Sequence, residues 1–307
     1  MFAVDWVVSV AGFAVGSIVG MTGMGGGALM TPILVLLFGI PPSVAVGSDL
    51  AASLFMKPLG AAVHMKRGTV HGALVRNLVV GSVPAAFAGA ATINHLGRAH
   101  DIDALMRMLL GGALIVAAAA ALLKSALKDR HADLPPGASQ VPFALKPAHT
   151  VAIGVLGGFI VGMTSVGSGS LVIVMLMLLY PRLSGSRLVG TDLVQAIPLV
   201  AAAALGHALF GHIKLSLTAS LLVGSLPGVY LGALVSSRAP DRVIRPTIVV
   251  VLVASALKLL GVSNQIVLLV SALVIGGAIV TNLLRREGQS ARVESPAAPR
   301  LEAPPAK

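Results

Sequence analysis

Apolar residues form long blocks along this chain, and short polar stretches separate the blocks. Most blocks hold close to the ~20 residues that a helix needs to cross a hydrocarbon core of ~30 Å. The pattern therefore predicts an all-α polytopic membrane protein. The blocks cover residues 4–20, 28–39, 43–64, 73–94, 104–123, 148–162, 169–180, 188–210, 215–236, 243–261 and 264–284.

Two of these blocks, 28–39 and 169–180, are too short to cross a membrane, because about 12 residues rise only ~18 Å in a helix. Each begins within a stretch rich in glycine and serine, "GMTGMGGGAL" (20–29) or "GMTSVGSGSL" (162–171). Glycine is disfavoured in a helix interior by about 0.8–1.0 kcal/mol relative to alanine. We therefore expect the transmembrane helix to be broken, or the chain to be re-entrant, near these glycines.

The two glycine-containing stretches belong to a larger internal repeat. They align at an offset of 142 residues, and "GSDL" (47–50) aligns with "GTDL" (190–193) at an offset of 143. Several landmarks in the same order at a nearly constant offset indicate that one unit was duplicated. Further matches are His64 with His207, Gly68 with Gly211, and "VGSVP" (80–84) with "VGSLP" (223–227).

Basic residues are distributed unequally between matching loops of the two repeats. The 180–188 loop carries Arg182 and Arg187, whereas its counterpart at 39–43 carries no charge. By the positive-inside rule, the two units are then inverted repeats, with the N-terminus outside and the C-terminus inside. The predicted organisation is a first transmembrane repeat (1–127), a basic linker loop (128–147), a second transmembrane repeat (148–261), an additional transmembrane helix (262–284) and a disordered tail (285–307).

Composition narrows the classes of function. The chain is 56% hydrophobic and only 11% charged, and it has no cysteine, which excludes disulfides, cysteine nucleophiles and thiolate metal sites. The net charge of +11 fits basic cytoplasmic loops. We therefore expect the protein to lie in a lipid bilayer and not to bind nucleic acid. The sequence contains no Walker or H-E-x-x-H motif, and we expect no cofactor and no metal. A homo-oligomer remains an open alternative.

The short blocks begin where a small anion could bind. The N-terminus of a helix carries free amides and a positive dipole end, and glycine lets an oxyanion approach the backbone closely. Broken helices of this kind hold anionic groups in transporters with inverted repeats. Close packing of helices through small residues is the alternative reading. The candidate substrate-binding residues are Thr22, Gly25, Gly26, Gly27, Ser48, Lys57, Thr164, Ser165, Gly167, Ser168, Gly169, Ser170, Thr191 and Gln195.

Five of the ionisable residues within or at the ends of the apolar blocks are candidates for a role in transport, because charge there is costly and often functional. Asp49 and Asp192 occupy matching positions and are either helix caps or carriers of a coupling proton. His64 and His207 are secondary candidates for proton coupling, or else hydrogen-bond a neighbouring helix. Lys57 has no basic counterpart and either snorkels, pairs with an aspartate, or presents a fixed positive charge to the anion.

The chain also resembles a known family. "GMTGMGGGALMTPIL", "VGSDLAAS", "VGTDLVQA" and the paired H-x-x-x-G are similar to the TauE/SafE family of sulfite and organosulfonate exporters, over residues 5–261. The resemblance implies a membrane permease for small sulfur-containing anions. The second glycine stretch departs from the family pattern, with Ser165 and Ser168 where the first has Gly23 and Gly26.

We therefore expect a secondary transporter, and not an enzyme, that exports sulfite or organosulfonates across the cell inner membrane, with proton coupling as a hypothesis. A passive anion channel and a membrane subunit that only scaffolds a partner are alternatives. An intramembrane serine hydrolase would use Ser168 or Ser170 with His207. It is disfavoured because a rhomboid-like G-x-S-G motif would need glycine at Val166.

Overall fold

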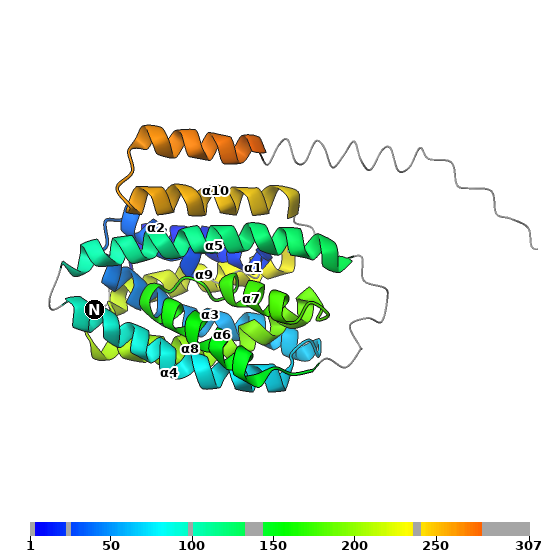
Figure 1. Cartoon of the computed structure of the whole chain (residues 1–307). Coiled ribbons are helices and arrows are strands. Elements are labelled where there is room, and N and C mark those ends of the chain that lie inside the picture. Colours follow the sequence, from blue (N-terminus) through cyan, green and yellow to red (C-terminus); the bar gives the residue numbers. More distant parts are fainter. Residues whose placement is uncertain (1–3, 23–25, 98–100, 133–143, 236–240, 278–307) are drawn as a thin grey trace, which may run out of the picture.

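The computed structural model describes residues 4–22, 26–97, 101–132, 144–235 and 241–277. Within these ranges the chain forms helices and turns and no strand, which confirms the all-α prediction (Figure 1). The tail predicted at 285–307 lies outside the described residues, as does most of the expected linker. The helices are α1 (Trp6–Thr22), α2 (Gly27–Leu36), α3 (Pro42–Lys66), α4 (Gly72–Gly97), α5 (Ile102–Ala132), α6 (Pro147–Thr164), α7 (Leu171–Leu179), α8 (Gly185–Leu209), α9 (Leu215–Val235) and α10 (Asp241–Leu259), followed by an apolar helix at Asn264–Gly277.

Five of the described helices, α4, α5, α6, α8 and α9, are long and apolar enough to cross a membrane. The two short blocks form short helices, since α2 has 10 residues and α7 has 9. Helix α5 continues to Ala132, beyond the 104–123 block, because several of the residues that follow Leu123, namely Lys124, Ala126, Leu127 and Lys128, are good helix formers. How the two repeats face the membrane, and whether α2 and α7 are re-entrant, remain predictions.

The helix contacts keep the same pattern when α1–α5 are exchanged for α6–α10. Helix α1 packs along α9, and α6 packs along α4. Helix α3 packs on α8, and α5 on α10. Short helix α2 contacts α3 and α10, just as α7 contacts α8 and α5. Each unit therefore completes its packing with helices of the other unit, and the broken segments lie in the shared interior.

Glycine stripes hold the α1–α9 and α4–α6 pairs close together. A Cβ atom at Gly20 of α1 would lie 2.2 Å from the Val229 carbonyl oxygen of α9, and one at Gly162 of α6 would lie 2.1 Å from the Ala86 carbonyl oxygen of α4. Only hydrogen fits at such distances, so the backbones touch. The alternative reading of close packing therefore holds for Gly20 and Gly162, the first glycine of each motif.

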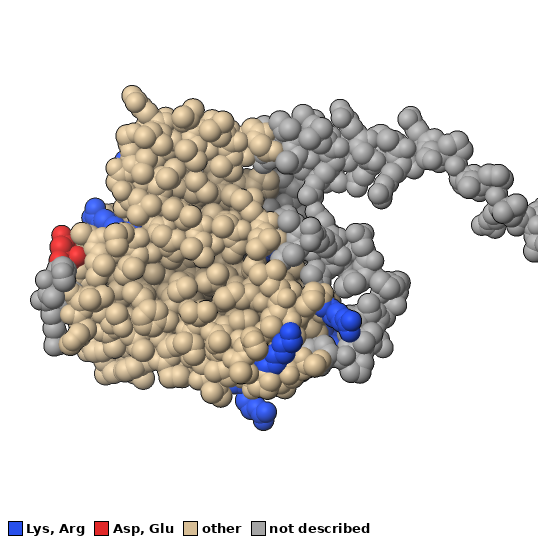
Figure 2. All heavy atoms as spheres, in the orientation of Figure 1, with Lys and Arg blue, Asp and Glu red and all other residues tan. Residues whose placement is uncertain are grey.

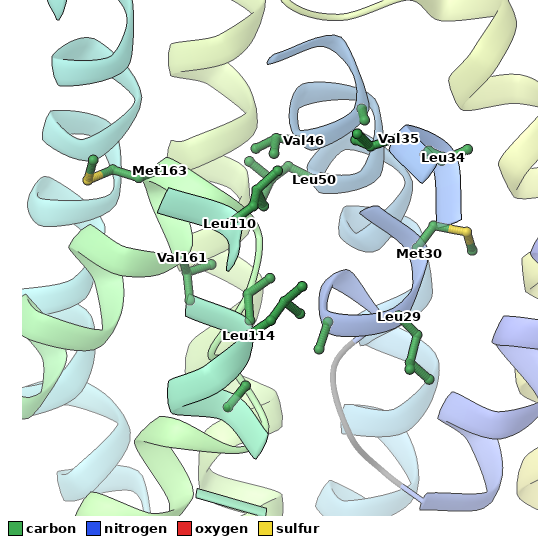
Figure 3. Close-up of a cluster of buried hydrophobic side chains, with 14 of the residues drawn as sticks. Leu29, Met30, Leu34, Val35, Val46, Leu50, Leu110, Leu114, Val161 and Met163 are labelled. Atoms are coloured by element: carbon green, nitrogen blue, oxygen red, sulfur yellow. The ribbon is translucent and has the colours of Figure 1, made fainter. Parts of the chain in front are cut away.

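Side chains of the short helix α2 are buried by other helices. Leu29, Met30 and Leu34 of α2 belong to one apolar cluster with Leu110 and Leu114 of α5 (Figure 3). Charged side chains gather at the two ends of the bundle, and the face shown in Figure 2 is uncharged between them. This distribution is the one expected of helices that cross a bilayer.

Candidate functional site

Residues 165–170 form an irregular loop between α6 and α7, called the α6–α7 loop below. Ser165 ends α6 with φ +60°, and its amide donates to the Val161 carbonyl at 2.7 Å. Gly167 and Gly169 follow with φ of +122° and +91°, a region that other residues rarely adopt. Gly167 and Gly169 are therefore required by the shape of the loop.

The first amides of α7 are not the free donors expected from the sequence. Those of Leu171 and Val172 both point at the Gly167 carbonyl oxygen, at 3.0 and 3.4 Å. At α2, the amides of Leu29 and Met30 point at the Gly26 carbonyl at 3.0 and 2.8 Å. The Gly167 carbonyl therefore satisfies amides of α7 that were expected to face an anion.

The two glycine-containing stretches meet inside the protein. A Cβ atom at Gly27, the first residue of α2, would lie 1.9 Å from the Ser165 carbonyl oxygen and 2.5 Å from its hydroxyl. Gly26 is buried beside the Met56 side chain, whereas Gly25 lies outside the described residues. Thus the start of α2 and the α6–α7 loop form one contact, although about 140 residues separate them in the sequence.

Asp49 of α3 lies next to this contact and is 1% exposed. Its Oδ2 accepts hydrogen bonds from the Ser165 hydroxyl at 2.7 Å and the Thr31 hydroxyl at 3.0 Å. Its Oδ1 is buried and has no hydrogen-bond partner. Asp49 lies well inside α3, seven residues past Pro42, so it does not cap that helix.

Lys57 is the buried cation of the site. It is 8% exposed, and its Nζ donates to the Ser168 hydroxyl at 2.9 Å, which ties α3 to the α6–α7 loop. Asp49 and Asp192 are the acidic residues near it. Lys57 therefore does not snorkel to the surface, and it contributes a positive charge beside the broken helix.

Asp192 of α8 is held by a different set of groups. Its Oδ1 accepts from the Gln195 amide at 2.9 Å. The Gln195 carbonyl in turn accepts from the Ser82 hydroxyl of α4 at 3.1 Å. Lys124 of α5 donates to the Gly169 carbonyl at 3.4 Å.

Ser48 and Thr191, expected to bind substrate, make matching contacts between the two units. The Ser48 hydroxyl accepts from the Lys214 amide before α9, and the Thr191 hydroxyl accepts from the His71 amide before α4, both at 3.1 Å. Gly47, which precedes Ser48, lies against the turn after α8. The G-S/T-D-L motif therefore binds the turn of the other unit through its first two residues and sends its aspartate inward.

The H-x-x-x-G landmarks are helix ends. The Thr69 amide donates to the His64 carbonyl at 3.1 Å while Gly68 has φ +64°, the geometry in which glycine terminates a helix. The His64 ring meets the Thr69 hydroxyl at 2.9 Å. The His207 ring contacts the Gly162 carbonyl at 2.9 Å, so both histidines bind neighbouring structural groups.

The remaining candidate hydroxyls do not gather around one point. Those of Thr22 and Thr164 donate to carbonyls one turn back, at Ile18 and Ile160, both at 2.7 Å. Ser170 is buried at the start of α7 and does not cap it with its side chain. The serine hydrolase alternative loses its dyad, because His207 binds Gly162 and the Ser168 hydroxyl binds Lys57.

A cavity of about 250 Å³ lies between α5 and α6 and reaches the α6–α7 loop. Its wall is mostly apolar, with Thr164, Val166 and Gly167 on the loop side. Sequence reasoning missed this cavity and also missed Thr31, Ser82 and Lys124. Only Thr31 carried a signal, as a polar residue within a short block that is otherwise almost wholly apolar; the other roles depend on contacts far apart in the sequence.

Comparison with known proteins agrees with the resemblance. The family model "Sulfite exporter TauE/SafE" matches residues 8–259. The probable membrane transporter protein YjnA of Bacillus subtilis (strain 168) is 39% identical over 251 residues, which cover 81% of this chain and 97% of that protein. The probable membrane transporter protein YdhB of the same organism is 28% identical over 240 residues, covering 77% and 92%. No solved structure gives a significant match. With its helices and these relatives, the chain is a multi-pass membrane protein that belongs to the TauE/SafE sulfite exporter family of membrane transporters.

Proposed function

We propose that this protein is a secondary transporter that exports small sulfur-containing anions, such as sulfite or organosulfonates, across the cell inner membrane. The observation that supports this most directly is the buried Lys57, which is hydrogen-bonded to Ser168 at the interruption between α6 and α7. A cation inside a membrane protein is costly and marks the path of an ion or substrate. The family supports sulfite and sulfonates as the class of anion.

Lys57 and Ser168 are the groups that would meet the anion. An ammonium and a hydroxyl both donate hydrogen bonds, and a sulfite or sulfonate oxygen accepts them. The anion would replace the Lys57–Ser168 hydrogen bond with bonds to itself, in a site where both donors are already turned toward each other. The α6–α7 loop is then the part of the site that rearranges during transport.

Flux measurements on Lys57 variants test this proposal. In proteoliposomes loaded with sulfite or methanesulfonate, we expect Lys57→Met to reduce efflux at least tenfold, which corresponds to about 1.4 kcal/mol of lost interaction. Lys66→Met is the matched control, because Lys66 lies on the same helix but is exposed. Equal loss in both variants, or full flux in Lys57→Met, would contradict the role of Lys57.

The passive channel is separated from the transporter by a gradient experiment. Vesicles with equal anion concentrations on both sides are given a step in pH. A proton-coupled transporter accumulates the anion against its own gradient, whereas a channel does not. Net accumulation that disappears with a protonophore supports coupling, and flux without accumulation supports the channel.

A further inference from the structure

The two aspartates at matching positions of the repeat differ in what surrounds them. We propose that Asp49 is the carboxyl group that carries the coupling proton, and that Asp192 stays ionised near the two cations Lys57 and Lys124. This inference rests on the proposed proton-coupled transport and assigns the two carboxyl groups within it different roles. The sequence alone treats them as equivalent candidates.

Asp49 has the surroundings of a neutral acid. It is 1% exposed, and its two hydrogen bonds come from neutral hydroxyls, those of Thr31 and Ser165, which both reach Oδ2. Both hydroxyls favour the ionised form, but they leave Oδ1 unpaired, and burying a carboxylate with one unpaired oxygen is costly. A proton on the unpartnered Oδ1 removes that charge and leaves Oδ2 as a carbonyl that accepts both hydroxyls.

Asp192 has the surroundings of a carboxylate. The Gln195 amide donates to its Oδ1 at 2.9 Å, and two cations, Lys57 and Lys124, oppose the cost of burying its charge. Asp192 differs from Asp49 in having this second cation, and nearby positive charges favour the ionised form. Among the described residues, Lys57 of the same helix is the one charged group that acts on Asp49, while α2 and the α6–α7 loop present hydroxyls to it.

The sequence explains why the two sites diverged. At the positions that match Thr31, Ala52 and Lys57 of the first repeat, the second repeat has Ile173, Gln195 and Val200. The hydroxyl that meets Asp49 therefore has no equivalent at Asp192, and the amide that meets Asp192 has none at Asp49. Each half has a polar partner that the other half lacks.

The assignment gives the coupling a sign. With Asp49 neutral and Asp192 ionised, Lys57 and Lys124 leave the site with a net positive charge, which attracts an anion. With Asp49 ionised, the charges cancel and that attraction is lost. Anion and proton therefore bind together, and they move in the same direction.

Infrared spectroscopy of the full chain in lipid vesicles tests the assignment without any anion present. A protonated carboxyl group has a carbonyl-stretching band apart from those of carboxylates and amides. At pH 7 we expect this band in the wild-type protein and in Asp192→Asn, and its loss in Asp49→Asn. A wild-type protein without the band, or a band lost in Asp192→Asn and kept in Asp49→Asn, would overturn the proposal.

A second variant protects the test against a misfolded Asp49→Asn protein. Thr31→Val keeps the shape of the side chain and removes one of the two donors to Oδ2. We expect the band to remain and to move to higher frequency, because its carbonyl loses a hydrogen bond. An unmoved band would refute the assignment to Asp49. Because these spectra need no substrate, they stand apart from the flux assays: failure of sulfite efflux would reject the proposed function and leave the protonation of Asp49 in place.

Discussion

The closest backbone contact between helices α1 and α9 predicts a large loss of stability from one methyl group. A Cβ atom at Gly224 of α9 would lie 1.8 Å from the Ser9 carbonyl oxygen, whereas ordinary contact begins near 3.4 Å. In Gly224→Ala the helices must therefore separate by about 1.6 Å, the difference of these two distances. This movement breaks two hydrogen bonds to Ser220, from the Asp5 amide at 2.9 Å and the Ser9 hydroxyl at 2.8 Å.

The expected magnitude follows from the two effects together. Overpacking costs about 1–3 kcal/mol, and each hydrogen bond between membrane helices contributes about 0.6 kcal/mol. Gly224→Ala should therefore reduce the free energy of unfolding by about 2–4 kcal/mol. In thermal unfolding of the purified protein in detergent, this is a fall of several degrees in the midpoint.

Two further glycines serve as controls. A Cβ atom at Gly81 of α4 would lie 2.3 Å from the Val151 carbonyl oxygen of α6, so Gly81→Ala should destabilise the protein similarly at the matching interface. A Cβ atom at Gly112 of α5 would meet open space, and Gly112→Ala should leave the midpoint unchanged or slightly raised. If all three variants unfolded at the wild-type temperature, close backbone contact would not be what the glycine stripes provide.

Three other variants probe the site and its supports. Gly27→Ala places a methyl group 1.9 Å from the Ser165 carbonyl oxygen, so we expect it to displace the α6–α7 loop and to reduce anion efflux more than tenfold. Efflux at the wild-type rate would contradict the contact between α2 and this loop. Ser48→Ala removes the acceptor of the Lys214 amide and should lower stability by about 0.5–2 kcal/mol in an unfolding assay, with no change in the substrates transported. Burial lowers the pKa of His212 from 6.5, so protonation of this residue favours the unfolded chain. The free energy of unfolding, measured as a function of pH, should therefore decline as the pH falls through 6.5, and His212→Gln should flatten this part of the curve.

Local features of the fold could be predicted from the sequence. The helix breaks could be predicted from glycine and serine beside blocks too short to span a membrane. Both signals are local, because they depend on residues close together in the sequence. The glycine stretches divide between the two readings considered at the outset. Gly20 and Gly162 serve helix packing, whereas Gly167 and Gly169 shape the loop.

The arrangement of the candidate site could be predicted only in part. The sequence placed Lys57, Asp49 and Asp192 among the important residues because ionisable groups are rare in apolar blocks. It did not indicate that Ser165 would reach Asp49, since 116 positions separate them and only the packing of the two units brings them together. The prediction that the first amides of α7 are free donors was wrong, because they donate to the Gly167 carbonyl and the conformation of Gly167 depends on the whole loop.

The crosswise pairing of α1 with α9 and of α6 with α4 has a consequence for biogenesis. Helix α1 leaves the ribosome long before α9 is made. The glycine surface of α1 therefore has no packing partner in the bilayer while most of the protein is being synthesised. The first unit alone also lacks the partner of its earliest helix. Fragments that stop before α9 should therefore be targets for membrane quality-control proteases, and two halves made as separate chains should survive only when they are produced in the same cell.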